Sequence, residues 1–233
     1  MAILKLFSSL LHQKNILSIS GESGTGKTTL ALYLIGHLLP NKEGSCIWVQ
    51  VSEQFPKKRL ISLFRDKKDI LHYLENHIFV IPKKNTCKTY QEQTTILQQL
   101  SNNTSALPPE LKFIVVDNIS HHLRFALSCI TSIPEKISLL DSFYEDTLLP
   151  LIMFCQRENV YLILLHEVSF NPNQNSQTMF FSTLYKRLDV IHVNLSHVFN
   201  QSHKKMTIYS GSHTWIFHYI IVPNGFFFKY DKE

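Results

Sequence analysis

The chain has 233 residues, which suits one well-filled α/β domain and is short for two. Hydrophobic residues make up 44% of the chain and charged residues 18%, and this composition excludes an intrinsically disordered protein. The net charge of +5 permits a polyanionic partner without requiring one. We therefore expect a single folded domain over residues 1–233.

The N-terminal segment and the cysteines indicate in which cellular compartment the protein is expected. Residues 1–11 are apolar in places, but they have neither a signal-peptide cleavage pattern nor the apolar span of roughly 20 residues that a membrane helix needs. Four cysteines are scattered without C-x-x-C spacing, namely Cys46, Cys87, Cys129 and Cys155. Buried, reduced thiols are the natural reading. We expect an intracellular protein of the cytoplasm, nucleoid or nucleus.

The first strand and helix of the chain enclose a phosphate-binding motif. A buried strand is predicted at 16–20 and a helix at 28–39. Between them stands Gly21-Glu22-Ser23-Gly24-Thr25-Gly26-Lys27-Thr28, which fits G-x-x-x-x-G-K-[ST]. A chance Gly-Ser turn is the alternative, and the match at all eight positions with the correct flanks disfavours it.

The chemistry of this loop needs these residue types. Glycines let successive backbone N–H groups point at phosphate oxygens, and the following helix adds the positive end of its dipole. Lys27 is expected to reach the β- and γ-phosphates, Thr28 to bind Mg²⁺, and Thr29 to complete the nucleotide contacts. The motif therefore predicts binding of a nucleoside triphosphate.

Strand and helix patterns alternate along the rest of the chain. Strands are expected at 46–51, 78–81, 113–116 and 161–165, and helices at 57–64, 69–75, 89–100 and 139–158. A polar loop is expected at 170–178, followed by late strands at 190–195, 205–209, 215–222 and 226–228. This alternation predicts an α/β fold with a mostly parallel central sheet flanked by helices, which the late strands extend in antiparallel fashion.

Two acidic residues follow predicted strands. Asp117 ends the apolar strand 113–116, which is the pattern of a Walker B carboxylate that acts on Mg²⁺; a helix N-cap is the alternative. Asn118 stands where many ATPases place a glutamate that orients water, so the base must come from elsewhere. Glu53, at the end of the second strand, is the candidate, and a solvated loop glutamate is the alternative.

Four segments of the chain carry a family resemblance. In order they are GESGTGKTTLALYL, IWVQVSEQFPKKRL, FIVVDNISHHLR and NVYLILLHEV. This series resembles the ATPase core of the RecA/RadA recombinases, and above all the small archaeal RadB-type paralogues. The resemblance covers nearly the whole chain; its P-loop is generic, and the other segments match through order and spacing. It implies a RecA-like fold that binds ATP and Mg²⁺, Glu53 as catalytic base, and Arg59 stacked on adenine; a surface arginine is the alternative.

Departures from the family pattern matter for the expected activity. The family usually has Thr-Asn-Gln, with a γ-phosphate-sensing Gln, where this chain has Leu165-His166-Glu167. Glu167 at that position would repel the γ-phosphate unless a cation intervenes. The segment at the family's second DNA-contacting loop, 169–179, contains no Lys or Arg. The chain also starts too close to its P-loop for us to expect the family's usual polymerisation segment. The resemblance therefore implies a recombinase relative without strand exchange.

These observations lead to one expected function and three alternatives. We expect an accessory or mediator of homologous recombination and DNA repair, with weak or partner-dependent ATP hydrolysis. Its expected partners are a recombinase or paralogue, within an oligomer or hetero-complex, and single-stranded DNA, but no membrane. The alternatives are a non-hydrolysing P-loop interaction module, a KaiC-like signalling ATPase and, ranked lower because the chain has few arginines for a lid, a nucleotide kinase.

Overall fold

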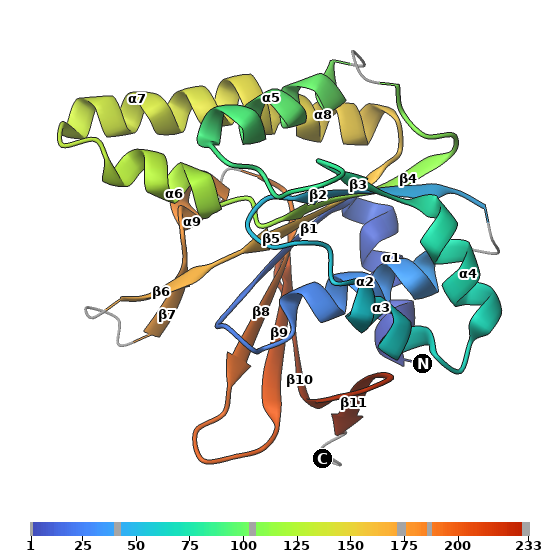
Figure 1. Cartoon of the computed structure of the whole chain (residues 1–233). Coiled ribbons are helices and arrows are strands. Elements are labelled where there is room, and N and C mark those ends of the chain that lie inside the picture. Colours follow the sequence, from blue (N-terminus) through green and yellow to red (C-terminus); the bar gives the residue numbers. More distant parts are fainter. Residues whose placement is uncertain (1, 40–42, 103–105, 172–175, 186–187, 230–233) are drawn as a thin grey trace.

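A computed structural model describes the chain except for residues 1, 40–42, 103–105, 172–175, 186–187 and 230–233. Within the described residues, nine strands form one sheet in the order β11-β10-β9-β8-β1-β5-β4-β2-β3 (Figure 1). The strands are β1 Ile16–Gly21, β2 Ser45–Gln50, β3 Ile78–Ile81, β4 Leu111–Asp117, β5 Tyr161–His166, β8 Ile191–His197, β9 Lys204–Ser210, β10 His213–Val222 and β11 Gly225–Lys229. A separate hairpin pairs β6 Val168–Asn171 with β7 Ser176–Met179.

The sheet is parallel on one side and antiparallel on the other. Strands β3, β2, β4, β5, β1 and β8 are paired in parallel, whereas β9, β10 and β11 follow β8 in antiparallel order. The expected fold class is confirmed. One detail was wrong, because β8, predicted as an antiparallel late strand, runs parallel to β1. The connection from β5, which holds the β6–β7 hairpin and a short helix, is long enough for the crossover that a parallel strand needs.

Helices cover both faces of the sheet (Figure 1). One layer consists of α1 Ala2–Lys14, α2 Lys27–Leu38, α3 Lys57–Phe64 and α4 Lys68–His77. The opposite layer consists of α5 Tyr90–Ser101, α6 His121–Ser128, α7 Ile133–Phe143, the π-helical turn Tyr144–Leu148 and α8 Leu149–Arg157, and a short helix α9, Ser182–Tyr185, precedes β8. None of the described helices combines the length and apolarity needed to span a bilayer.

Two hydrophobic cores lie on either side of the sheet, and single strands contribute to both. Along β4, Phe113 and Val115 pack with the α1–α4 layer, whereas Ile114 and Val116 pack with the α5–α8 layer. This alternation is the period of two that places successive side chains on opposite faces. The run looks uniformly apolar in sequence because both faces of a central parallel strand are buried.

Two other predicted elements differ from the structure. The helix expected at 139–158 begins at Ile133 and is interrupted by the π-helical turn Tyr144–Leu148. Pro150, in the first turn of α8, has no N–H to donate to the preceding turn, which accounts for the irregular hydrogen bonding there. The polar loop expected at 170–178 is mostly the β6–β7 hairpin, except for the residues outside the described part.

Candidate nucleotide-binding site

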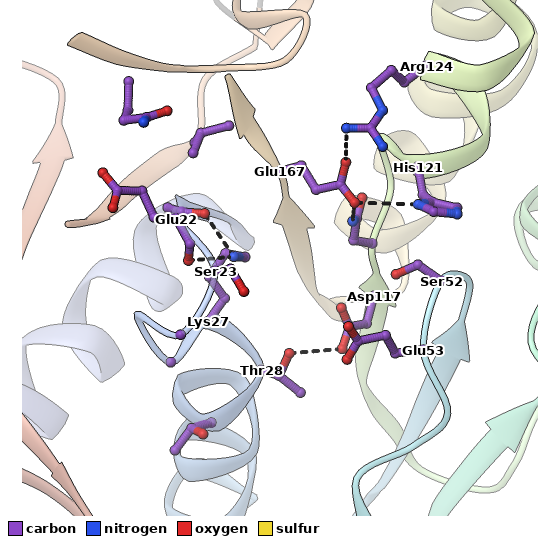
Figure 2. A pocket seen from close by; sticks show the side chains of 17 residues that line it. Glu22, Ser23, Lys27, Thr28, Ser52, Glu53, Asp117, His121, Arg124 and Glu167 are labelled. Atoms are coloured by element: carbon purple, nitrogen blue, oxygen red, sulfur yellow. Dashed lines mark hydrogen bonds and ion pairs between the residues drawn. The ribbon is translucent and has the colours of Figure 1, made fainter. Parts of the chain in front are cut away.

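A cavity of about 770 Å³ opens beyond the carboxyl ends of the parallel strands. This is the edge at which open α/β sheets bind ligands. Figure 2 shows the cavity between the loop that follows β1 and the ends of β2, β4 and β5. The lining residues are Gly21, Glu22, Ser23, Gly24, Gly26, Lys27, Thr28, Thr29, Ser52, Glu53, Asp117, Asn118, His121, Arg124, Glu167, Val168 and Gln177.

The 21–28 loop is curled and tied to itself. Gly24 and Gly26 have φ angles of 74° and 95°, a region that side chains with a Cβ disfavour. The Lys27 ammonium donates to the backbone carbonyls of Gly21, at 2.8 Å, and Glu22, at 3.0 Å. The Thr25 hydroxyl also donates to the Glu22 carbonyl, at 2.7 Å. The amino end of α2, which begins at Lys27, therefore faces the cavity with a cation beside it.

The C-terminal strands support this loop from behind, a feature that the motif did not predict. The Tyr219 hydroxyl of β10 donates to the Thr25 carbonyl at 2.7 Å. A Cβ added to Gly21 would lie 2.3 Å from the Leu195 carbonyl oxygen of β8, and one added to Gly26 would lie 2.6 Å from Cδ1 of Ile221. Backbone packing thus excludes a side chain at Gly21, whereas at Gly26 the positive φ angle is the stronger constraint, because the tip of Ile221 can move.

Thr28 and Asp117 form the second part of the site. The Thr28 hydroxyl donates to Oδ2 of Asp117 at 3.1 Å, and Glu53 lines the same end of the cavity (Figure 2). Burial raises the pKa of Asp117 to about 6, and the nearby Glu53 adds to the rise, whereas the Thr28 hydrogen bond and Lys27 oppose it. Within the described residues, no cluster of three or more His, Cys, Asp or Glu could enclose a metal. A hydroxyl and a carboxylate suit Mg²⁺, which commonly takes one or two protein oxygens and completes its shell with phosphates and water.

Lys27 lies in a strongly acidic environment. Burial lowers the pKa of its ammonium, and the carboxylates of Asp117, Glu167, Glu53 and Glu22 act in the opposite direction. All four carboxylates line the cavity. A bare triphosphate would therefore meet substantial repulsion, and a cation that accompanies it would offset this repulsion.

Glu167 is the centre of a polar cluster on the far side of the cavity (Figure 2). Its Oε2 pairs with Nη1 of Arg124 at 2.7 Å. Its Oε1 accepts a hydrogen bond from the Asn118 amide at 2.8 Å and lies 3.4 Å from Nδ1 of His121. Arg124 was not among the predicted site residues; the signal available was its place on a helix that directly follows the Asp117 strand.

Arg59 and His166 lie outside the cavity lining. The Arg59 guanidinium donates to the Thr29 hydroxyl at 3.2 Å and to the carbonyls of Val222 and Pro223, both at 3.0 Å. It thereby joins α2 to the turn between β10 and β11, and its expected contact with adenine stays a prediction. His166 is fully buried against the Tyr185 ring, and burial lowers its pKa to about 3, so the imidazole is neutral.

A glycine-rich loop between the first strand and helix of a mostly parallel sheet, with its threonine bonded to an aspartate that ends β4, defines a P-loop NTPase with a RecA-like arrangement. A family model described as an AAA domain matches residues 10–164, more than half of the chain, and the chain belongs to this family. The chain is also similar to the DNA repair protein RAD57 of Saccharomyces cerevisiae, with 27% identity over 182 residues. That match covers 74% of this chain and 38% of the yeast protein, so the chain spans less than two fifths of its relative's length. These findings confirm the expected RecA-like ATPase core.

Proposed function

We propose that this chain is an ATP-binding recombinase paralogue of the RadB type, which acts as an accessory or mediator in homologous recombination and DNA repair. The observation that carries the proposal is the single cavity that is lined by the curled loop with Lys27 and by the Thr28–Asp117 pair. The similarity to a protein named for DNA repair supports the biological role. We place the protein inside the cell, in the cytoplasm, nucleoid or nucleus.

The proposed ligand is ATP with Mg²⁺. The backbone N–H groups of 21–28 would hold the phosphates, Lys27 would contact the β- and γ-phosphates, and Thr29 would contribute at the start of α2. Thr28 and Asp117 would hold Mg²⁺, which neutralises phosphate charge when it is bound. This neutralisation is needed here because four carboxylates surround Lys27.

Hydrolysis in this site would be slow and would depend on Glu53. Both ends of the Asn118 amide are already engaged, because its oxygen accepts hydrogen bonds from the backbone and hydroxyl of Ser120, at 3.0 and 2.9 Å, and its nitrogen donates to Glu167. Glu53 is exposed at the cavity and has the carboxylate that a general base requires. In-line transfer to water needs positioning and charge neutralisation more than covalent chemistry.

A second candidate function is a P-loop module that binds ATP without hydrolysing it. The Glu167 carboxylate favours this alternative, because it lies close enough to Lys27 to affect the lysine's pKa and therefore close to where the terminal phosphate would lie.

In either case we propose assembly with a recombinase or paralogue in an oligomer or hetero-complex, and contact with single-stranded DNA. Exposed apolar side chains beside the site, such as Phe125 at 52% exposure, support a partner surface.

Calorimetry tests the binding proposal directly. Wild-type protein titrated with ATP and Mg²⁺ should show saturable binding, and Lys27→Ala should weaken it by about 100-fold or more, since charge-assisted hydrogen bonds to phosphate are lost. Lys58→Ala is the matched control, because Lys58 is an exposed lysine outside the cavity lining. Absence of binding to the wild-type protein, or equal binding by Lys27→Ala, would contradict the proposal.

The role in DNA repair needs a separate measurement. Binding to single-stranded DNA should weaken with salt, because phosphate contacts release counterions, and the slope should change when ATP is present. A salt dependence that is the same with and without nucleotide would separate DNA contact from the ATP site. No DNA binding under either condition would leave the partner protein as the only route to a repair function.

A further inference from the structure

The cavity contains a second cation whose role the P-loop motif does not explain. Among the described residues that line the cavity, Lys27 and Arg124 are the only lysine and arginine, and they stand on opposite sides of it (Figure 2). Lys27 belongs to the loop after β1, whereas Arg124 belongs to α6, which follows β4. The space between two such cations suits an anion that reaches across the cavity.

Arg124 is held towards the cavity by an ion pair and by two aromatic rings. Its guanidinium pairs with the Glu167 carboxylate at 2.7 Å, with the two side chains 38% and 27% exposed. The guanidinium carbon lies 5.4 Å from the ring centre of Phe125 and 5.1 Å from that of Phe180. Contacts of this kind restrict the guanidinium without replacing its hydrogen bonds, so the group remains available to an oxyanion.

Glu167 keeps two neighbours at Oε1 when Arg124 leaves Oε2. The Asn118 amide donates to its other oxygen at 2.8 Å, and His121 lies 3.4 Å from the same atom. The Glu167 backbone N–H donates to the Ser120 hydroxyl at 3.2 Å, which fixes the main chain at the end of β5. An exchange of partners by Arg124 therefore costs less than the breaking of an unsupported buried pair.

The charge balance of the cavity favours such an exchange. Four carboxylates face two cationic side chains before any ligand arrives, and Glu167 neutralises one of those cations. A terminal phosphate offers more negative charge than a carboxylate and accepts the bidentate hydrogen bonds of a guanidinium equally well. Adenosine diphosphate lacks the group that would extend from the 21–28 loop towards Arg124.

We propose that Arg124 is a phosphate-binding residue of this site, which exchanges Glu167 for the terminal phosphate of ATP and thereby makes the protein prefer ATP to ADP. This inference rests on the proposed function. Glu167, at the position where the family resemblance implies a γ-phosphate sensor, is here the residue that holds Arg124 until nucleotide binds. The exchange begins from the Arg124–Glu167 ion pair, whose atoms lie 2.7 Å apart.

The test compares the affinities of a non-hydrolysable ATP analogue and of ADP, both with Mg²⁺. Arg124→Ala should weaken binding of the analogue by about tenfold or more, the loss expected for a charged hydrogen bond, and should change ADP binding by less than about twofold. Arg157→Ala is the matched control, because Arg157 likewise combines an ion pair, with Glu158, and a ring contact, with Phe154, but lies outside the cavity lining. This variant should leave both affinities unchanged.

A second variant tests the same exchange and should change the affinity for the analogue in the opposite direction. Glu167→Gln keeps a side chain that can bond to Arg124 but removes the competing charge, so it should strengthen binding of the analogue severalfold with little effect on ADP. If the ion pair were purely structural, each variant would change the affinities for both nucleotides by the same factor, since loss of folded protein does not distinguish them. Equal changes for the two nucleotides, or no change in either variant, would overturn the inference while nucleotide binding itself stands. Failure of the wild-type protein to bind either nucleotide would overturn the inference and the proposed function together.

Discussion

The hydroxyl of Thr28 donates to the carboxylate of Asp117 across 3.1 Å, although 89 positions separate the two residues in the chain. Thr28 lies in the first turn of α2, which follows β1, and Asp117 ends β4. Strand β5 stands between β1 and β4 in the sheet, so the contact is made by the helix and loop reaching along the carboxyl edge. This pair joins the phosphate-binding loop to the opposite side of the cavity.

Asp117 should make stability depend on pH. Burial raises its pKa from 3.8 to about 6, so the stability that the protonated group contributes is present below pH 3.8 and is lost as pH rises through 6. Asp117→Asn removes the buried charge. At pH 8 without nucleotide we expect this variant to be more stable by about 1–3 kcal/mol, with the difference vanishing near pH 4. Chemical denaturation at the two pH values measures it, and a less stable variant at pH 8 would contradict the expectation.

Glu53→Gln separates ATP binding from ATP hydrolysis. If Glu53 is the general base, the change should reduce turnover by about 100-fold or more and leave nucleotide affinity nearly unchanged. The amide keeps the size of the side chain, and Glu53 is exposed, so folding should be unaffected. Glu135→Gln, at an exposed position on α7, is the control. Turnover that survives Glu53→Gln would assign the base elsewhere, and a wild-type protein without turnover would favour the non-hydrolysing module.

Arg59→Ala should destabilise the fold. The substitution leaves the carbonyls of Val222 and Pro223 and the Thr29 hydroxyl without the guanidinium, and we expect a loss of about 1–3 kcal/mol in the free energy of unfolding. Thermal melting without nucleotide measures this loss, and Arg65→Ala, at an exposed arginine just after α3, is the control. A fall in ATP affinity at unchanged stability would assign the guanidinium to adenine instead, as the family resemblance implies.

Gly36→Ala should also destabilise the protein, against the usual preference of helices for alanine. A Cβ at position 36 of α2 would lie 2.1 Å from Cζ of Phe64, a fully buried ring on α3. We expect the clash to outweigh the gain of about 0.5–1 kcal/mol in helix propensity and to cost about 1–3 kcal/mol net. Denaturant unfolding measures the change. In a Phe64→Leu background the same substitution should become neutral or favourable, and an equal cost in both backgrounds would exclude the clash as its cause.

Much of the fold could be predicted because it depends on short stretches of chain. Apolar runs such as 113–116 and 161–165 predict buried strands, and their boundaries agree with β4 and β5 to within a few residues. The direction of β8 could not be predicted in this way, because the length and path of the crossover decide it. The β6–β7 hairpin was missed for a related reason, since backbone pairing leaves little trace in a stretch of Asn, Gln and Ser.

The candidate site likewise has features that the local sequence predicts and features that it does not. The loop at 21–28 is a contiguous motif whose residue types carry its chemistry, so the chain order alone indicates it. The place of Asp117 also follows from pattern, because it ends an apolar strand at the edge where parallel strands bind ligands. No local pattern marks the pairing of Arg124 with Glu167, since the two residues come from different elements that meet only in the folded protein.

The sequence by itself determined that the chain forms a mostly parallel α/β sheet and where on it the P-loop motif lies, because periodicity and a contiguous motif act over a few residues. The tertiary structure decided what surrounds that loop. Tyr219 of β10 donates a hydrogen bond to it, Arg59 donates to the β10–β11 turn, and Arg124 pairs with Glu167 at the cavity. These contacts depend on sheet order and on the distances between side chains that are remote in the chain, which packing of the whole molecule sets.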